Sequence, residues 1–404
     1  MGYHLNVQMK EQKQNYIRYE IDKGKNLFFL PHFNRFSFDC LPSNIEAQYY
    51  EDELSEMRIE ITYLCNGNCK YCIVFGNSIN GYETLELREI WNWFTSQFWF
   101  KKIKRIFIIG GEPFLRSSDL FFLLKNFEGE VRISTNATLI TKEIANKLAK
   151  YNVLLYVSLD GPRACDNSMR VYKNGQHMFP DVIRGLKFLG EAQVPYGIFM
   201  VATKDNIYRA VDVIKEIDTV FNPVRIGYSM PHWTDTNYDE ISAEDYRDAL
   251  IDLFYCRREI NAQIMQINWR IKPLWKGKIK RFSCALHTSQ VTVLPDQSLV
   301  RCSKIDHDSI LKKVSNEDLN NGCPLAMASK GTEPCASCLA VGCCGGGCPF
   351  DGLKRYGGII DKRECIITPA IVELALKEVI AKIKTDDNLK RGLIDPKYIK
   401  EVLL

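Results

Sequence analysis

The sequence predicts an α/β protein: a parallel sheet covered by helices, followed by a small cysteine-rich domain. Between residues 57 and 265, short β-branched segments alternate with longer amphipathic ones, as expected for strands joined by helical crossovers. Polar or glycine-rich residues follow five consecutive predicted strands. Most of the 15 cysteines of this 404-residue chain gather in two regions, and convergent metal ligation requires such clustering.

Length, composition and charge narrow the class of protein. The 404 residues are enough for two or three domains, at roughly 100–200 residues per domain. The 53 basic and 49 acidic residues give a net charge of +4, which excludes the strongly basic character of a dedicated nucleic-acid-binding protein. No apolar run reaches the length of a membrane span, which is about 18 residues. The polar N-terminus lacks a signal-peptide core, so we expect a cytoplasmic protein without membrane or nucleic-acid partners.

The predicted elements follow one another along the chain. Residues 1–56 form an N-terminal segment, in which 25–38 predicts a β-hairpin whose apolar face packs elsewhere. The sheet domain spans 57–265, with strands at 57–64, 105–109, 131–135, 153–159, 196–202 and 224–229. Helices are predicted at 86–100, 117–127, 141–150, 178–191, 206–218 and 242–260. The alternation stops there; the cysteine-rich domain covers 266–368, and 369–404 holds an amphipathic helix over 369–383 and a tail.

The residues that follow the strands are chemically distinctive. The carboxyl ends of parallel strands meet at one edge of the sheet, where ligands bind. The residues at these ends are Cys65, the Gly-Gly-Glu-Pro segment 110–113, Thr135 with Asn136, the Asp-Gly-Pro segment 160–162, and the Thr-Lys-Asp-Asn segment 203–206. His232 and Trp233 follow the sixth strand and are further candidates to face a substrate. We therefore expect the functional site at this edge.

The first cysteine group follows the first strand and has the spacing C-x3-C-x2-C. It consists of Cys65, Cys69 and Cys72. A structural zinc site needs four ligands, whereas a four-iron cluster on three thiolates keeps one iron open for a small molecule. The intervening Asn-Gly-Asn residues tolerate the left-handed backbone angles of a tight turn. A zinc loop with a distant fourth ligand is the alternative.

These motifs resemble those of the radical S-adenosylmethionine (SAM) superfamily. The cysteine loop contains an aromatic residue, Tyr71, before its last cysteine. The segments GGEP at 110–113, STNA at 134–137 and VSLDGP at 157–162 match the motifs of later strands, and Arg170 follows at a similar interval. Ala137 stands where glycine is usual. The resemblance covers roughly residues 57–235 and implies a partial (β/α)6 barrel.

The resemblance also implies a ligand set. Cys65, Cys69 and Cys72 would hold a [4Fe–4S] cluster, whose open iron takes the amino and carboxylate groups of SAM. Glu112 and the backbone of Gly110 and Gly111 would receive the amino group, since a carboxylate complements a buried ammonium. The other implied SAM-binding residues are Tyr71 beside the cluster, Ser134 and Asn136 at the methionine or ribose, and Ser158, Asp160 and Arg170 at the carboxylate and ribose. For each of them, the alternative is an ordinary turn or cap residue.

The C-terminal cysteines resemble the SPASM extension of many radical SAM enzymes, although C-x2-C pairs also occur in zinc ribbons. By this resemblance, a first auxiliary cluster would be held by Cys284, Cys302 and Cys348, and a second by Cys335, Cys338, Cys344 and Cys365. With the SAM cluster, this makes three [4Fe–4S] clusters. The first auxiliary cluster lacks a fourth ligand; Cys323, Cys256 or an open iron are the alternatives. Gln297 stands where the family usually has glycine before the second cysteine.

Enzymes with this extension mostly modify peptides or proteins. The resemblance therefore implies an oxidoreductase whose 5′-deoxyadenosyl radical takes hydrogen from a peptide or protein, with auxiliary clusters assisting oxidation or crosslinking. An electron donor such as flavodoxin or ferredoxin would be its partner. A small-molecule dehydrogenase and a sulfatase maturase are alternatives, but maturases carry aspartate where this chain has Ser303. A non-enzymatic zinc-binding interaction protein is the third possibility.

Overall fold

The structure is a computed structural model that describes residues 9–13, 16–22, 25–49, 54–74, 84–234, 240–280, 289–304, 314–315, 319 and 335–404. Its main feature is a nine-stranded sheet in which six neighbouring strands are parallel and lie in chain order. These strands are β5 (Glu56–Thr62), β6 (Arg105–Gly110), β7 (Glu130–Thr135), β8 (Val153–Ser158), β9 (Tyr196–Val201) and β10 (Arg225–Ser229). The six predicted strands are therefore confirmed.

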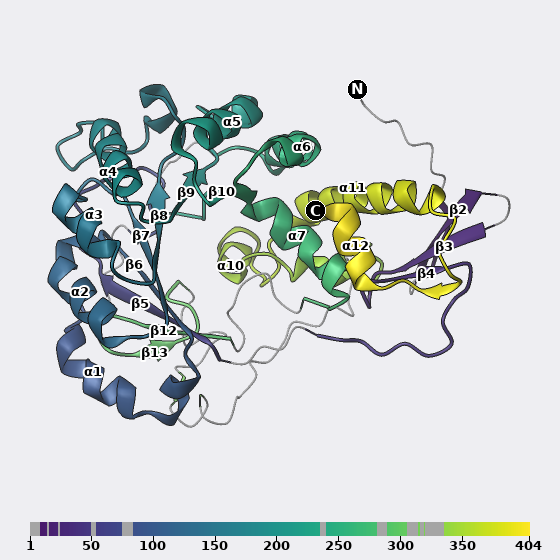
Figure 1. The fold of residues 1–404 in the computed structure, drawn as a ribbon, viewed down its shortest axis with the longest axis horizontal. Coiled ribbons are helices and arrows are strands. Elements are labelled where there is room, and N and C mark those ends of the chain that lie inside the picture. Colours follow the sequence, from purple (N-terminus) through teal and green to yellow (C-terminus); the bar gives the residue numbers. More distant parts are fainter. Residues whose placement is uncertain are drawn as a thin grey trace.

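Helices cover the outer face of this curved sheet, as Figure 1 shows on the left of the molecule. They are α1 (Leu87–Ser96), α2 (Ser117–Asn126), α3 (Lys142–Leu148), α4 (Phe179–Glu191), α5 (Ala210–Phe221) and α6 (Ala243–Cys256). In β5, Met57, Ile59 and Ile61 are fully buried. Since side chains alternate along a strand, Arg58 and Glu60 lie on the opposite, inner face. The α/β fold with crossover helices is confirmed.

Aromatic rings fill the middle of the inner face. The ring of Tyr156 stacks on that of Phe199 with centroids 4.2 Å apart, and the ring of Phe107 meets Tyr156 edge-on at 5.7 Å. Ser158 lies two residues beyond Tyr156 and so projects from the same face, nearer the carboxyl end of the strand. Ser134 is in register with Tyr156 on the neighbouring strand. The aromatic layer therefore forms a floor beneath the carboxyl ends of the strands.

The sheet extends beyond the six predicted strands. A short β11 (Gln263–Ile264) pairs with β10, and on the other side β12 (Gln290–Val293) pairs in parallel with β5. The antiparallel β13 (Leu299–Val300) completes this edge. The alternation does not stop at residue 265, because α7 (Met265–Lys276) follows directly and contains Pro273 in its interior. The beginning of the cysteine-rich region is thus part of the sheet.

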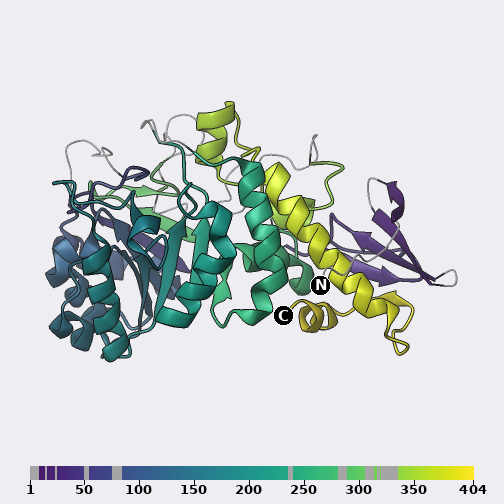
Figure 2. The same ribbon diagram turned by 90° about the horizontal axis from the view of Figure 1, so that it is seen from above.

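A second, five-stranded sheet lies at the opposite end of the molecule (Figures 1 and 2). It contains β1 (Met9–Lys13), β2 (Tyr16–Asp22), β3 (Lys25–Leu30), β4 (Arg35–Phe38) and the C-terminal β14 (Gly392–Leu393). The predicted hairpin at 25–38 is confirmed as β3 and β4. Its apolar side chains Leu27, Phe29 and Phe36 are buried in a core that also contains residues of α11 (Glu364–Lys384).

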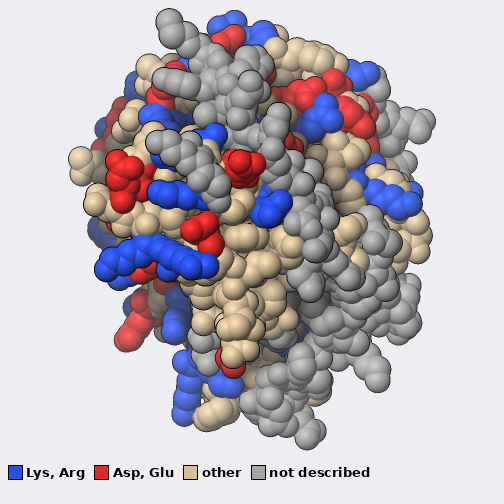
Figure 3. Space-filling model, turned by 90° about the vertical axis from the view of Figure 1, so that its right-hand side faces the viewer, with Lys and Arg blue, Asp and Glu red and all other residues tan. Residues whose placement is uncertain are grey.

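The described part of the C-terminal region also contains α9 (Val341–Cys344), α10 (Pro349–Tyr356) and α12 (Pro396–Leu403). The helix predicted at 369–383 is present as α11 but begins earlier, at Glu364. Figure 3 shows basic and acidic side chains interspersed with uncharged ones on the face at the end of the N-terminal sheet. None of the helices in the described part of the chain has both the length and the hydropathy needed to cross a membrane.

Candidate functional site

The three-cysteine loop begins just after β5, and its three thiols lie near enough to one another for their charges to interact. The Cys65 Sγ accepts a hydrogen bond from the Gly67 N–H at 3.2 Å, and the Cys72 N–H donates to the Cys69 carbonyl at 3.0 Å. Burial raises the pKa of Cys65 to about 11, and the nearby Cys69 and Cys72 thiols contribute to this shift. Three converging soft donors suit iron or zinc. A bound metal would relieve the mutual repulsion of their thiolates.

The segment 169–173 holds this loop from one side. The Asn68 N–H donates to the Val171 carbonyl at 2.7 Å, and the Lys70 N–H donates to the Met169 carbonyl at 3.2 Å. Gly67 forms a bridge with Tyr172 in the same pairing. The cysteine loop is therefore paired along its backbone with a segment 100 residues later in the chain.

Arg170, in this segment, forms a buried bidentate ion pair with Asp160. Its Nε and Nη2 atoms lie 2.9 and 2.8 Å from the two carboxylate oxygens. The Tyr71 hydroxyl donates to the same carboxylate, and the guanidinium lies 5.3 Å from the Tyr71 ring. Burial opposes the charge of Arg170, but Asp160 outweighs this effect and raises the pKa of Arg170. Asp160, Arg170 and Tyr71 thus contact one another, and Tyr71 connects the buried ion pair to the cysteine loop.

Glu112, at the end of β6, is completely buried. Its carboxylate accepts hydrogen bonds from the Phe114 N–H at 3.0 Å, the Thr135 hydroxyl at 2.7 Å and the Asn136 N–H at 2.8 Å. Burial raises the pKa of Glu112 to about 6, although these hydrogen bonds oppose the shift. The carboxylate is thereby fixed at the carboxyl ends of β6 and β7, beside the cysteine loop.

Two glycines allow β6 to approach the end of β5. A Cβ atom on Gly110 would lie 2.2 Å from the Thr62 carbonyl oxygen, and one on Gly111 would lie 2.1 Å from the Leu64 carbonyl oxygen. Gly110 also has a φ of +136°, which favours glycine. Any side chain at either position would push Glu112 away from the cysteine loop.

Asn136 is connected to the cysteine loop through Asn66, which the sequence indicated only as a turn residue. Its Nδ2 donates to Asn66 Oδ1 at 2.8 Å, and Asn66 Nδ2 in turn donates to the Thr138 hydroxyl at 2.9 Å. Ser134 and Ser158 are half-buried on the inner face. The position of Asn66, directly after Cys65, is the signal that would have identified it.

A second overlooked group lies on the inner face of β5. The Glu60 carboxylate is completely buried, accepts a hydrogen bond from the Ser303 hydroxyl and lies 4.0 Å from Lys304 Nζ. Among the described residues, Glu60 Oε2, the Tyr63 hydroxyl and Lys304 Nζ are buried without a hydrogen bond of normal geometry, although both Tyr63 and Lys304 lie near enough to interact with Glu60. A buried group of this kind calls for a ligand or water. An acidic residue within an apolar strand was the available signal.

Five of the described C-terminal cysteines fall into two groups. Cys302 and Cys348 both pack against Phe350, together with Ile73 from the end of the cysteine loop. Cys365 lies near Cys335 and Cys338, whose thiols add to the effect of burial and raise the pKa of Cys365. Cys344, predicted in the second set, lines a cavity together with Cys348, so the division of the cysteines between two auxiliary clusters stays a prediction. Cys284 and Cys323 lie outside the described residues.

Thiols of all three predicted clusters share one local geometry. Like Cys65 with Gly67, Cys302 accepts the N–H of Lys304 and Cys344 accepts the N–H of Gly346, each at 3.4 Å. Hydrogen bonds to sulfur stabilise thiolates and tune iron–sulfur clusters. The donor set and its local geometry therefore fit the predicted clusters.

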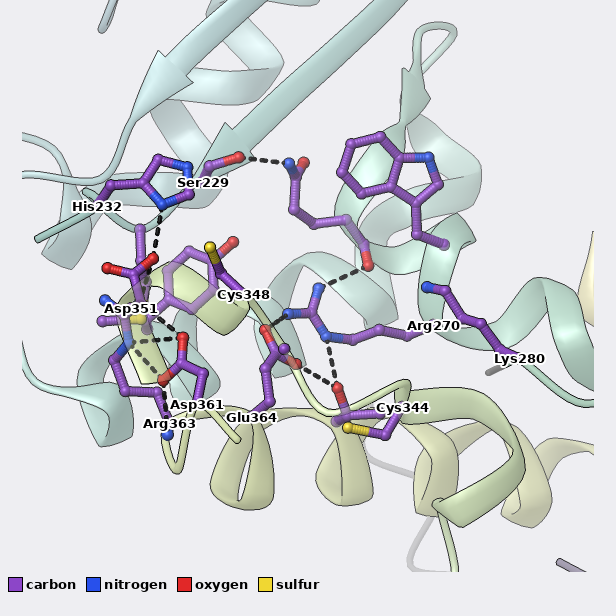
Figure 4. A pocket seen from close by; sticks show the side chains of 16 residues that line it. Ser229, His232, Arg270, Lys280, Cys344, Cys348, Asp351, Asp361, Arg363 and Glu364 are labelled. Atoms are coloured by element: carbon purple, nitrogen blue, oxygen red, sulfur yellow. Dashed lines mark hydrogen bonds and ion pairs between the residues drawn. The ribbon is translucent and has the colours of Figure 1, made fainter. Parts of the chain in front are cut away.

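A cavity of about 210 Å³ lies at the carboxyl end of β10, between the barrel and the C-terminal cysteines (Figure 4). The Cys344 and Cys348 thiols both line it. On one wall, Arg270 binds Glu364 at 2.6 Å. On the other, His232 Nδ1 lies 2.6 Å from an Asp351 oxygen. Desolvation opposes the charge of the imidazole, but Asp351 and Cys348 outweigh it and raise the pKa of His232.

Comparison with known proteins identifies a family for part of the chain. Residues 59–217 match the model of the Radical SAM superfamily. The uncharacterized protein MJ0907 of Methanocaldococcus jannaschii is 28% identical over 171 residues, which are 41% of this chain and 58% of that protein. The radical SAM cyclopropyl synthase TigE of Paramaledivibacter caminithermalis is 23% identical over 361 residues, covering 78% of this chain and 72% of TigE.

Solved structures share the fold over a larger part of the chain. The enzyme anSMEcpe with bound AdoMet and the Cp18Cys peptide has a TM-score of 0.65 at 20% identity, covering 82% of this chain and 99% of that one. SuiB of Streptococcus suis, bound to its precursor peptide SuiA, has a TM-score of 0.57 at 17% identity and covers 77% and 76%. Together with the cysteine loop at the end of β5, these matches show a Radical SAM domain over residues 59–217 in a chain whose fold, including the cysteine-rich C-terminal region, is similar to those of anSMEcpe and SuiB.

Proposed function

We propose that this protein is an enzyme that modifies a peptide or protein substrate by radical chemistry. The observation that carries the proposal is the placement of the three-cysteine loop and the C-terminal cysteines: Ile73, which follows the loop, shares one apolar cluster with Cys302 and Cys348. The likeness in fold to anSMEcpe and SuiB, both solved with peptides, supports a peptide substrate.

The residues of the chain divide the work of holding the cofactors. Cys65, Cys69 and Cys72 would hold the SAM cluster, and the C-terminal cysteines would hold two auxiliary clusters. A cluster bound to the three-cysteine loop would supply the electron for reductive cleavage of SAM, the source of the 5′-deoxyadenosyl radical that would take a hydrogen atom from the substrate. Glu112, fixed by three hydrogen bonds, would receive the SAM ammonium.

Other side chains would orient the loop and keep water out. The buried Asp160–Arg170 pair anchors the cysteine loop through the Tyr71 hydroxyl. We expect this pair to act on the cluster indirectly, by positioning the cysteine ligands. The stacked rings of Tyr156 and Phe199 close the inner face below the site. Exclusion of water protects a reactive radical from side reactions.

The substrate would approach the polar group on β5. Glu60 and Tyr63 belong to β5 and its extension toward Cys65, whereas Lys304 follows Cys302 by two residues. Their buried polar atoms, which make no hydrogen bond of normal geometry, provide one carboxylate acceptor and two donors. A peptide amide offers both a donor and an acceptor, so it could satisfy this group as it lies between the two cysteine loops.

Co-expression with short peptides encoded beside the gene tests the proposal. The full-length enzyme and each peptide are produced anaerobically in heavy water, and the intact mass of the peptide is measured. Loss of two hydrogens indicates crosslinking or dehydrogenation, and a gain of deuterium alone indicates epimerisation; either supports the proposal. The Cys65→Ala variant should leave the peptide unchanged. An unmodified peptide beside undiminished SAM cleavage would contradict a peptide substrate and favour a small-molecule one.

A further inference from the structure

We infer that His232 is the fourth ligand of the first auxiliary cluster, beside Cys302, Cys348 and Cys284. This inference rests on the auxiliary clusters of the proposed function. It assigns a ligand to a position that the cysteine spacing leaves unfilled. It also ties that cluster to β10 of the barrel, because His232 lies only three residues after the end of this strand.

The position of His232 brings it to the Cys348 thiol. The ligand atoms of His232, Cys348 and Asp351 all lie within 4.8 Å of one another. The next residue, Trp233, packs against Phe350 in the same cluster as Cys302 and Cys348. Figure 4 shows the imidazole above Asp351 on the wall of the cavity that Cys348 also lines. His232 therefore lies beside the Cys348 thiol, and Cys302 joins the same apolar cluster through Phe350.

The hydrogen bonding of the ring is that of a metal-binding histidine. Such histidines donate their second ring N–H to a carboxylate or carbonyl, which fixes the ring and leaves the other nitrogen for the metal. Here Nδ1 faces the Asp351 carboxylate at 2.6 Å. This assigns the proton to Nδ1 and leaves Nε2 for iron. Half of the His232 side chain is exposed, so the ring is accessible from the cavity.

Asp351 is itself held rigidly. Its carboxylate is completely buried, accepts the Trp233 N–H at 2.6 Å, and lies 3.1 Å from the Arg363 guanidinium and 3.3 Å from that of Arg355. Both of its oxygens are thus engaged with groups other than a metal. Asp351 is therefore the residue that orients His232, and the histidine, whose ring also contacts the Cys348 thiol, is the member of this pair that remains to bind a metal.

The cysteine alternatives for the fourth ligand differ in position. Cys256 lies at the end of α6, where its thiol donates to the Leu253 carbonyl at 3.6 Å and lies near Lys215 and Glu259. It lines a separate groove formed with α11 and α12, which shares no residue with the cavity that contains Cys348. Cys323 lies outside the described residues, so the experiment must compare it directly with His232.

Pulsed electron paramagnetic resonance distinguishes nitrogen from sulfur ligation. We would use the full-length protein with Cys65→Ala, which removes the SAM cluster and isolates the auxiliary signals. In this background the reduced protein should show the strong 14N coupling of a directly bound imidazole. The coupling should disappear in His232→Ala, change on 15N-histidine labelling, and persist in Cys323→Ala and in His177→Ala, an exposed control. His232→Cys should lower the reduction potential of the cluster, since imidazole ligation raises it.

Two other outcomes would overturn the inference, and they separate it from the proposed function. Full auxiliary iron without nitrogen coupling, or with coupling that survives His232→Ala, would contradict His232 ligation but leave the clusters in place. A hydrogen bond from the ring to the Cys348 thiolate would give this result. Absence of auxiliary iron, with the SAM cluster alone present in the wild-type protein, would contradict both the inference and the auxiliary clusters of the proposed function.

Discussion

At the scale of single residues, the buried Asp160–Arg170 pair decides whether the cysteine loop keeps its shape. Both side chains are buried, and Tyr71 within the loop donates to the same carboxylate. Asp160→Asn would leave Arg170 buried without its counter-charge, which should lower the free energy of unfolding by about 3–5 kcal/mol. Tyr71→Phe removes only one hydrogen bond and should cost about 1–3 kcal/mol. Anaerobic denaturant unfolding measures both values; equal, small effects would contradict this role.

The raised pKa of Glu112 makes a prediction about pH. A folded pKa of about 6, against an unfolded value of 4.5, means that the fold prefers the protonated acid. The resulting stabilisation is complete below pH 4.5 and is lost as the pH rises through 6. Relative to Glu112→Gln, which is neutral throughout, the wild-type protein without SAM should lose about 1 kcal/mol between pH 5 and 7.5.

Unfolding free energies of the two proteins, measured across this pH range, test the prediction. If the difference in unfolding free energy between wild type and Glu112→Gln stays constant across this pH range, Glu112 does not titrate within it and the prediction is wrong. Addition of SAM should oppose the pH trend, because its ammonium would favour the charged carboxylate. Glu143→Gln, on an exposed position of α3, is a suitable control.

At the scale of the elements, α4 must pack closely on the turn after β7. A Cβ atom on Gly185 would lie 2.3 Å from the Ala137 carbonyl oxygen, whereas one on Gly190, on the same helix, has no neighbour within 4 Å. Gly185→Ala should therefore destabilise the protein by about 1–3 kcal/mol. Gly190→Ala should stabilise it by up to about 1 kcal/mol, through helix propensity alone. Thermal unfolding of the two variants checks this; equal shifts would refute the close approach.

The turn between β3 and β4 supports the second group of C-terminal cysteines. Asn34 Nδ2 donates to the Lys278 carbonyl at 2.8 Å, and its Oδ1 accepts from the Cys343 thiol at 3.4 Å. His32 Nε2 lies 3.1 Å from the Ala336 carbonyl oxygen. These contacts reach both sides of the predicted second auxiliary site, since Ala336 follows Cys335 and Cys343 precedes Cys344.

Removal of the Asn34 side chain should therefore weaken the hold on that cluster. Asn34→Ala should lower the iron content per chain by up to one cluster and reduce the matching paramagnetic signal. Asn44→Ala, an exposed position in the segment after β4, should retain the full content. Iron and sulfide analysis of anaerobically purified protein measures this. Equal iron in both variants would show that the N-terminal sheet does not support the cluster.

Much of the barrel was predictable because its signals are local. The period of the strands and the polar residues at their ends identified β5 to β10 and the edge that carries the cysteine loop. By contrast, β12 is a four-residue strand in a cysteine-rich region, too short for a periodic pattern. The predicted strand–helix alternation ended at residue 265 and therefore missed α7. The proline in the interior of this helix obscures its helical pattern.

Contacts between distant residues could not be predicted from any local pattern. Asp351 meets His232 across 119 positions, and Ser303 meets Glu60 across 243. Both pairs join the barrel to the C-terminal region, and both were absent from the predicted site. The predicted contacts of Asp160 and Arg170 with SAM rest on the family resemblance alone. The structure adds the ion pair between these two residues, which could not be predicted before the fold was known.

At the scale of the whole molecule, the C-terminal region joins two sheets that lie at opposite ends (Figure 2). β12 extends the barrel sheet, whereas α11 packs with the N-terminal sheet and begins beside Cys365. The C-terminal cysteines that the structure describes therefore lie between the two sheets, next to the carboxyl ends of the barrel strands. Auxiliary clusters bound to these cysteines, as predicted, would therefore lie within the body of the protein.

The most direct test of the central claim is reductive cleavage of SAM by the purified, anaerobically reconstituted protein. With dithionite, the wild-type chain should convert SAM into 5′-deoxyadenosine and methionine, detected by mass spectrometry. Cys65→Ala should abolish the product, whereas Cys165→Ala, which removes an exposed thiol, should leave it unchanged. Absence of 5′-deoxyadenosine from protein with its full iron content, or undiminished cleavage by Cys65→Ala, would contradict the account.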